Sequence, residues 1–176
     1  MNNPLVQTLT PRPLTAEFFA PFGQVIEIPA EDAAYQTINC STCRRYDALA
    51  EVDVSGTAGI SIFSAVAREF PFQINLLERH PLGSQAFMPL GEANFIIAVA
   101  PDGHDNAPDW NNIQVFKAVS GQGVNFYRNV WHHPLLAIGN KGDFLVIDRL
   151  CGEDSEGNEN LIEINAPTDN ILQIVL

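Results

Sequence analysis

The chain has little positive charge. Its 176 residues carry 9 Lys and Arg against 21 Asp and Glu, so the formal net charge is −12. Binding to nucleic acid or to an anionic membrane surface needs a basic face, and we therefore expect neither partner. The acidic excess indicates no particular substrate, because it is typical of a surface that keeps a protein in solution.

Long apolar runs and cysteines are also scarce. The longest unbroken apolar run, residues 95–100, is too short to cross a bilayer, and the first residues lack the basic and apolar regions of a signal peptide. With three cysteines at least one is unpaired, which favours a reducing, cytoplasmic compartment. Cys40 and Cys43 form a C-x-x-C pair, for which a redox pair or half of a zinc site is an alternative without a second pair to support it.

Helix signals are few, and short strand-like runs are many. Thr15 can cap a short helix over residues 16–19, which Pro21 and Gly23 would end. Residues 140–143 are typical of a hairpin turn, 101–106 of an exposed loop and 151–160 of an acidic linker. Strands are predicted at 6–9, 24–28, 59–65, 86–89, 94–100, 113–119, 124–127, 135–138, 144–148, 161–164 and 171–175. This pattern predicts an all-β sandwich or barrel, formed by one domain over residues 1–176.

Two polar segments inside this β-like sequence are the first candidates for a functional site. Residues 78–85 and 127–134 contain three of the four histidines. Side chains alternate between the two faces of a strand, so Glu78 and His80 are expected to share a face. By the same rule Arg128 and His132 share a face, and only one of the adjacent histidines 132 and 133 can enter a common pocket. Converging segments of this kind predict a pocket that contains imidazole and guanidinium groups.

Other polar or aromatic residues have simpler explanations. His104 lies in the predicted exposed loop, where a polar side chain needs no function. Arg79 and Arg149 can be salt-bridge partners in an acid-rich chain, and Trp131 can be a core residue or a pocket wall.

The segments 77–87 and 121–135 resemble the signature stretches of the ureidoglycolate lyase family. The resemblance continues through 143–149, with a weaker similarity at Ile38-Asn39 and Arg45-Tyr46. It implies a cupin-like fold, a double-stranded β-helix or jelly-roll barrel, with a short N-terminal helix. It also implies cleavage of ureidoglycolate to glyoxylate and urea, a step of allantoin and purine nitrogen catabolism.

The resemblance implies a metal site that departs from the usual cupin pattern. Glu78-x-His80 stands where the pattern has H-x-H, Gln85 stands where it has Glu, and His132 matches the later His. Gly121 is kept, whereas Tyr127 and Asn129 replace a Pro and a second Gly of the pattern. The potential ligands Glu78, His80, Gln85 and His132 suit a divalent transition metal, nickel first and zinc or manganese as alternatives. A metal-free pocket remains the other reading.

The implied catalytic residues are His80 and His132 as base or metal ligands, Glu78 as a ligand or as the group that orients His80, and Arg128. We expect Arg128 to bind the substrate carboxylate, because a guanidinium matches it bidentately and strand parity places it beside His132. The remaining expected substrate-binding residues are Asn39, Arg45, Tyr46, Arg79, Gln85, Asn129, Trp131 and His133.

Alternatives to the lyase stay open. Glu78, His80 and His132 can also form the facial triad of a cupin dioxygenase, and a metal-dependent isomerase is possible on the same fold. A non-catalytic β-barrel that binds a small carboxylate is a further class, and an amidohydrolase would release ammonia instead of urea. Because exposed strand edges need covering, and the 171–176 strand can pair within or across subunits, we expect a homodimer.

Overall fold

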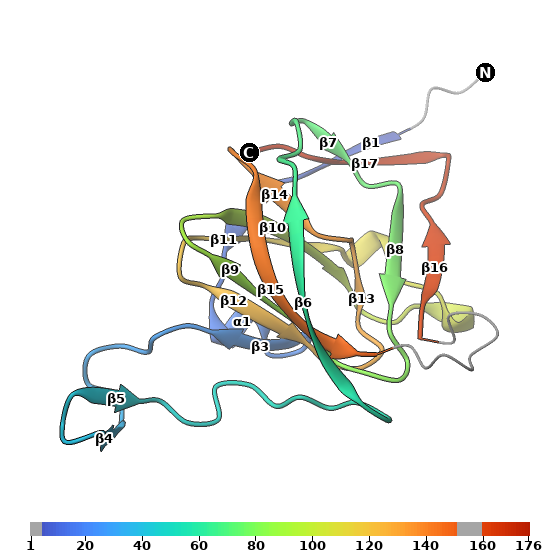
Figure 1. The fold of residues 1–176 in the computed structure, drawn as a ribbon. Helices are drawn as coiled ribbons and strands as arrows, with labels where there is room; N and C mark the ends of the chain where they lie inside the picture. The colour runs from blue at the N-terminus through green and yellow to red at the C-terminus, as the bar shows by residue number, and fades with distance from the viewer. Residues whose placement is uncertain (1–4, 151–159) are drawn as a thin grey trace.

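The computed structural model describes residues 5–150 and 160–176 and is built almost entirely of strands (Figure 1). The elements are β1 (Leu5–Leu9), β2 (Arg12–Pro13), α1 (Ala16–Phe19), β3 (Gly23–Ile26), β4 (Gln36–Ile38), β5 (Cys43–Arg45), β6 (Ala58–Ala65), β7 (Phe72–Gln73), β8 (Leu76–Arg79), β9 (Gln85–Leu90), β10 (Asn94–Ala100), η1 (His104–Asn106), η2 (Trp110–Asn112), β11 (Gln114–Ala118), β12 (Gly123–Phe126), β13 (Trp131–His132), β14 (Leu136–Ile138), β15 (Gly142–Arg149), β16 (Ile162–Asn165) and β17 (Asn170–Ile174).

Two large sheets form the body of the molecule. One has the order β16-β8-β13-β10-β11-β2, with β14 also paired to β10, and the other has the order β3-β12-β9-β15-β6. Smaller sheets are β1-β17-β7 and the isolated pair β4-β5. The architecture is all-β and cupin-like, as predicted, although the barrel is not closed.

Strand β10 is buried on both faces and therefore separates two hydrophobic clusters. Phe95, Ile97 and Val99 face the space between the two large sheets, whereas Ile96 and Ala98 face a second layer behind. The first cluster includes Phe19, Phe87, Phe116, Phe126, Phe144 and Val146. The second includes Leu9, Leu77, Trp131, Leu172 and Ile174, where the β1-β17-β7 sheet covers the barrel. A continuous apolar run is what a strand with two buried faces requires.

The predicted short helix is confirmed. Thr15 has extended backbone angles, and its hydroxyl accepts a hydrogen bond from the Phe18 backbone N–H at 3.3 Å, as an N-cap does. Phe19 at the end of the helix is fully buried and meets Phe116 edge-on. The single turn of α1 thus covers one end of the hydrophobic cluster between the two large sheets.

One local expectation was wrong, and one of two alternatives for the last strand is observed. Residues 140–143 do turn the chain, but β14 pairs with β10 whereas β15 pairs with β6 and β9, so no hairpin forms. Strand β17 packs within its own chain between β1 and β7, so it has no free edge for another subunit. Of the predicted linker at 151–160, residues 151–159 lie outside the described part of the chain.

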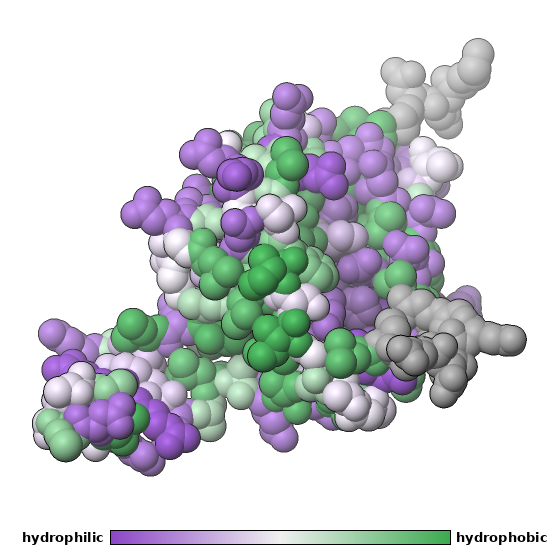
Figure 2. Space-filling model, in the orientation of Figure 1, coloured by the Kyte–Doolittle hydropathy of each residue, from purple (hydrophilic) through white to green (hydrophobic). Residues whose placement is uncertain are grey.

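The surface carries a projecting hairpin and an exposed apolar area. The β4–β5 hairpin projects away from the barrel (Figure 1). Within the described part of the chain, its hydrogen bonds and ion pairs all stay inside the hairpin and the residues next to it. Figure 2 shows apolar side chains gathered over β6 and β15, among them the exposed Ile60 and Ile62. Among the described helices none has the length and apolarity needed to span a membrane.

Candidate active site

Glu78, His80 and His132 meet at one point between the two large sheets. Glu78 on β8 lies directly opposite His132 on β13, and His80 follows β8 by one residue. The carboxylate Oε1 of Glu78 is 3.5 Å from His132 Nε2 and 3.8 Å from His80 Nε2. One ligand atom from each of the three residues falls within 4.8 Å of the others. The predicted sharing of a face by Glu78 and His80 is therefore confirmed.

Backbone carbonyls fix both imidazole rings. His80 Nδ1 is 2.7 Å from the Asn160 carbonyl oxygen, and His132 Nδ1 is 2.9 Å from that of Val130. A carbonyl only accepts, so each Nδ1 must carry the hydrogen, and in a neutral ring Nε2 is then the free lone pair.

The cluster fits a divalent transition metal. Both Nε2 atoms are buried, and neither has a hydrogen-bond partner among the described residues. Two imidazoles and a carboxylate form the donor set of many such sites, and an Nδ1–H held by a backbone carbonyl is the usual support for a histidine ligand. Glu78, His80 and His132 are thus the residues that can hold a metal.

The charges of the cluster are coupled. Burial alone would raise the pKa of Glu78, but the polar contacts and charges of His132 and His80 outweigh it and lower the pKa to about 2. Burial opposes the charged form of His80 as well, yet Glu78, the Asn160 carbonyl and the charge of Asp148 together raise its pKa. The site is therefore built to keep Glu78 ionised beside imidazole.

Gln85 and Asp148 lie beside this cluster. Gln85 pairs across β9 and β12 with Phe126, whose ring stacks on the His132 ring at 4.3 Å. The Gln85 amide nitrogen donates to Asp148 Oδ2 at 3.3 Å, and its buried oxygen has no partner among the described residues. Gln85 is therefore where the cupin-like alignment predicts it, close to the histidines.

The turn 127–130 comes just before His132 and is hydrogen-bonded to the backbone of His80. It interrupts the alternation of side chains that was predicted for a strand. Asn129 has φ +66°, a left-handed conformation that Asn tolerates and that Gly would adopt at this position of the cupin pattern. Its N–H donates to the His80 carbonyl at 3.0 Å. Because residues 127–130 are not extended, the expectation that Arg128 shares a strand face with His132 was wrong.

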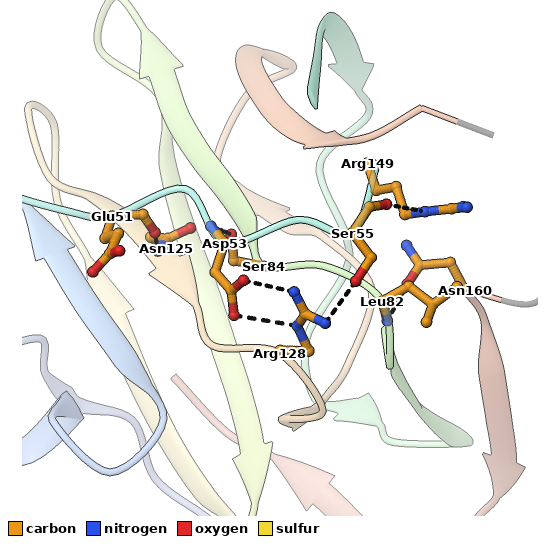
Figure 3. A network of polar contacts seen from close by, with 9 residues as sticks. All are labelled: Glu51, Asp53, Ser55, Leu82, Ser84, Asn125, Arg128, Arg149 and Asn160. Carbon is orange, nitrogen blue, oxygen red and sulfur yellow. Dashed lines mark hydrogen bonds and ion pairs between the residues drawn. The ribbon is translucent and has the colours of Figure 1, made fainter. Parts of the chain in front are cut away.

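Arg128 instead holds a strap, which we define as residues 51–57 and which crosses the sheet beside the site (Figure 3). Its guanidinium forms a two-pronged ion pair with Asp53, at 3.2 and 2.6 Å, and donates to the Ser55 hydroxyl at 2.9 Å. Backbone bonds also fix the strap next to the residues after His80. Ser84 N donates to the Asp53 carbonyl at 2.7 Å, and Ser55 N donates to the Leu82 carbonyl at 2.8 Å.

Three residues predicted to bind substrate point elsewhere. Arg79 lies over the Trp131 ring at 4.3 Å and 3.6 Å from Asp102, and Trp131 is buried in the second hydrophobic cluster. His133 meets Phe72 edge-on at 5.2 Å, and burial lowers its pKa despite its contact with the Pro134 carbonyl. Of the adjacent histidines, His132 is thus the one at the cluster with Glu78 and His80.

Asn39, Arg45 and Tyr46 are on or next to the projecting β4–β5 hairpin. Arg45 pairs with Asp47 at 2.6 Å, and Tyr46 contacts Tyr35. The structure therefore does not bring these three residues together with the Glu78 cluster within one chain.

Two residues near the cluster were not among the predicted site residues. Asp148 lies in the segment 143–149 that resembles the family, so its position was available as a signal. Asn160 orients His80 through its backbone, and its side chain accepts a hydrogen bond from Leu82 N at 2.7 Å. A backbone carbonyl that acts across 80 residues of sequence leaves no pattern to recognise.

Known proteins show strong similarity to this chain. The profile of the family described as Ureidoglycolate lyase matches residues 6–169. A ureidoglycolate lyase of Stutzerimonas stutzeri is 50% identical over 147 residues, covering 82% of this chain and 84% of the relative. One of Brucella anthropi is 47% identical over 153 residues, covering 85% and 88%. One of Burkholderia mallei is 42% identical over 173 residues, covering 97% and 99%. The chain belongs to the ureidoglycolate lyase family.

Proposed function

We propose that this protein cleaves ureidoglycolate to glyoxylate and urea in the breakdown of allantoin, in the cytoplasm. The observation that carries the proposal is the cluster of Glu78, His80 and His132, with two buried imidazole Nε2 atoms directed at one carboxylate. The exposed free thiols of Cys40 and Cys43 agree with a reducing compartment.

The reaction needs two proton transfers at one carbon. The hydroxyl loses its proton as the C–N bond breaks and the carbonyl of glyoxylate forms, and the leaving ureido nitrogen gains a proton to give neutral urea. A group that titrates near neutral pH suits both transfers, and imidazole is such a group.

We assign the cluster to a divalent transition metal, with nickel preferred over zinc or manganese. Glu78, His80 and His132 would hold it. When bound, such an ion acts as a Lewis acid that lowers the pKa of the substrate hydroxyl. In a metal-free site, His132 and His80 would instead hold and move the hydroxyl proton at their Nε2 atoms.

Arg128 is proposed to bind the substrate carboxylate. It extends from the turn that joins His80 to His132, and its side chain is partly accessible. In the structure Asp53 occupies its fork, so the substrate carboxylate has to replace that partner. Asp53 is then the group that keeps the guanidinium oriented before substrate binds.

The experiment is to incubate fresh ureidoglycolate with the purified protein, with and without chelator, and to measure urea, glyoxylate and ammonia. We expect equal amounts of urea and glyoxylate, loss of activity with chelator and recovery with nickel. His132→Ala should reduce turnover by roughly two orders of magnitude or more, whereas His104→Ala, in an exposed loop, is the matched control. Ammonia would indicate an amidohydrolase, oxygen uptake with bound iron a dioxygenase, and binding without product a binding module.

We also propose a homodimer formed through the exposed apolar face of β6. Strand β6 is the edge of its five-stranded sheet, and Ile60 and Ile62 are 73% and 57% exposed (Figure 2). An exposed apolar edge strand favours association, because a second subunit can cover both its unpaired backbone groups and its apolar side chains. Ile60→Asp with Ile62→Asp should give a monomer in light scattering, whereas Ile28→Asp, at another exposed site, should not. A wild-type monomer at all concentrations would refute the dimer.

A further inference from the structure

The amide of Gln85 has one end fixed and the other free. Gln85 is 7% exposed, its nitrogen donates to Asp148 Oδ2, and its oxygen is buried without a hydrogen-bond partner in the described part of the chain. A buried acceptor without a partner costs free energy, so such a position is expected where a ligand supplies the missing donor.

Gln85 and Asp148 face the same space between the two large sheets as the Glu78 cluster. Gln85 alternates with the core residue Phe87 along β9, and Asp148 alternates with Val146 along β15, so both side chains point between the large sheets. The strands are neighbours, with Ile147 paired to Ala86. Phe126, directly opposite Gln85, stacks on His132. The amide thus lies on the sheet face that is directed at the histidines.

Asp148 determines which end of the amide faces the ligand. A carboxylate can only accept, so the Gln85 NH₂ must point at Asp148 and the carbonyl oxygen must point away from it. Among the described residues, Asp148 has no Lys or Arg ion-pair partner, and the second carboxylate oxygen remains available as an acceptor. The pair therefore presents two acceptors, Gln85 Oε1 and the second carboxylate oxygen of Asp148.

We propose that Gln85 Oε1, oriented by Asp148, recognises the N–H groups of the ureido end of the substrate. A ureido group carries N–H donors on both nitrogens, which is the complement of an acceptor pair. Glyoxylate and glycolate have no N–H group to donate to these acceptors. Gln85 is thus a specificity residue, and Asp148 is a positioning residue that acts through it. The inference rests on the proposed function, because it assigns the urea side of that substrate.

The test compares two ligands that cannot be turned over, ureidoacetate and glycolate, by calorimetric titration of the protein as purified. Asp148→Asn lets the Gln85 amide turn either way, because an amide both donates and accepts. We expect the Kd of ureidoacetate to rise roughly 10- to 100-fold and that of glycolate to change less than about threefold. The KM for ureidoglycolate should rise more than kcat falls. Asp143→Asn, an exposed carboxylate on the same strand, is the control and should change neither Kd.

Gln85→Met provides a second variant that keeps the volume and removes both ends of the amide. It should reproduce the selective loss of ureidoacetate binding. An equal loss for ureidoacetate and glycolate in both variants would overturn the inference, as would a selective loss of bound metal in Gln85→Met, because Gln85 would then be a metal ligand. If ureidoglycolate is not cleaved by the wild-type protein while the selective loss of ureidoacetate binding remains, the proposed function fails and the inference stands.

Discussion

At the scale of single residues, the site depends on backbone carbonyls as much as on side chains. His80 and His132 are oriented by the carbonyls of Asn160 and Val130, which leave both Nε2 atoms free. The Asn160 backbone is in turn fixed because its side chain accepts from Leu82 N, two residues beyond His80. Groups that orient a metal ligand in this way contribute to metal affinity without touching the metal.

Asn160→Ala is therefore expected to weaken metal binding. Without the bond to Leu82 N, the Asn160 carbonyl loses its fixed position and His80 can rotate. We expect the nickel affinity to fall roughly 10- to 100-fold, measured by calorimetric titration of chelator-treated protein. Asn165→Ala, at an exposed position of β16, is the control. Unchanged nickel affinity in Asn160→Ala would mean that the ring of His80 is held by packing alone.

Residue types in the two polar segments predicted the cluster, but they did not predict where every side chain points. Alternation along β8 placed Glu78 and His80 on one face, as the structure has them. The same rule failed for Arg128 because Asn129 adopts a left-handed conformation and turns the chain. A single backbone angle, which a strand pattern does not show, thus decides whether the Arg128 side chain lies beside His132 or binds the strap.

At the scale of elements, apolar strands were predictable and the strands of the site were not. Runs such as 94–100 and 144–148 correspond to β10 and β15 because burial on one or both faces leaves a clear pattern. Strands β8 and β13 were missed since their polar residues serve the pocket and interrupt that pattern. The pairing of β14 with β10 instead of β15 depends on tertiary contacts, which a turn sequence does not encode.

The β4–β5 hairpin leads to a prediction at this scale. An isolated two-stranded hairpin is marginally stable, and this one has no hydrogen bond or ion pair to the described barrel. Replacing residues 36–45 by a short Gly-Ser link should change the melting temperature by less than about 2 °C and leave nickel affinity unchanged.

The same deletion should reduce kcat/KM for ureidoglycolate, because it removes Asn39 and Arg45, which were predicted to bind substrate. Within one chain they lie on the hairpin, so this loss requires that the hairpin acts on a second copy. Mixing the deletion variant with inactive His132→Ala protein should then restore part of the activity. Unchanged kcat/KM in the deletion variant alone would remove the hairpin from the reaction.

At the scale of the whole molecule, the coupled charges of the site should determine how the stability of the metal-free protein depends on pH. Glu78 has a pKa of about 2 in the folded state, below its ordinary 4.5, so its stabilising effect is present above pH 4.5 and is lost as the pH falls toward 2. The pKa of His80 is raised, so its effect is present below 6.5 and is lost as the pH rises through its folded value. His133 acts in the opposite sense, because burial lowers its pKa and stability falls as the pH drops below 6.5.

Comparison of wild type with Glu78→Gln measures the contribution of Glu78 together with the rise that it causes in the pKa of His80, and His133 is present in both proteins. In chelator-treated samples we expect the free energy of unfolding, measured by urea denaturation, to be higher in wild type by about 2 kcal/mol near pH 5.5. The difference should become small toward pH 2, where Glu78 is protonated in the unfolded state and about half protonated in the folded state. A difference that stays constant between pH 2 and 6 would show that Glu78 contributes through packing and not through its charge. Glu92→Gln, at an exposed turn, should show no such pH dependence.

Adding nickel at pH 7.5 should increase the difference in the free energy of unfolding between wild type and Glu78→Gln as the nickel concentration rises, because a ligand that binds the folded state stabilises it by mass action. The charge arrangement that makes the stability of the metal-free protein depend on pH would then be the one that stabilises the metal-bound protein.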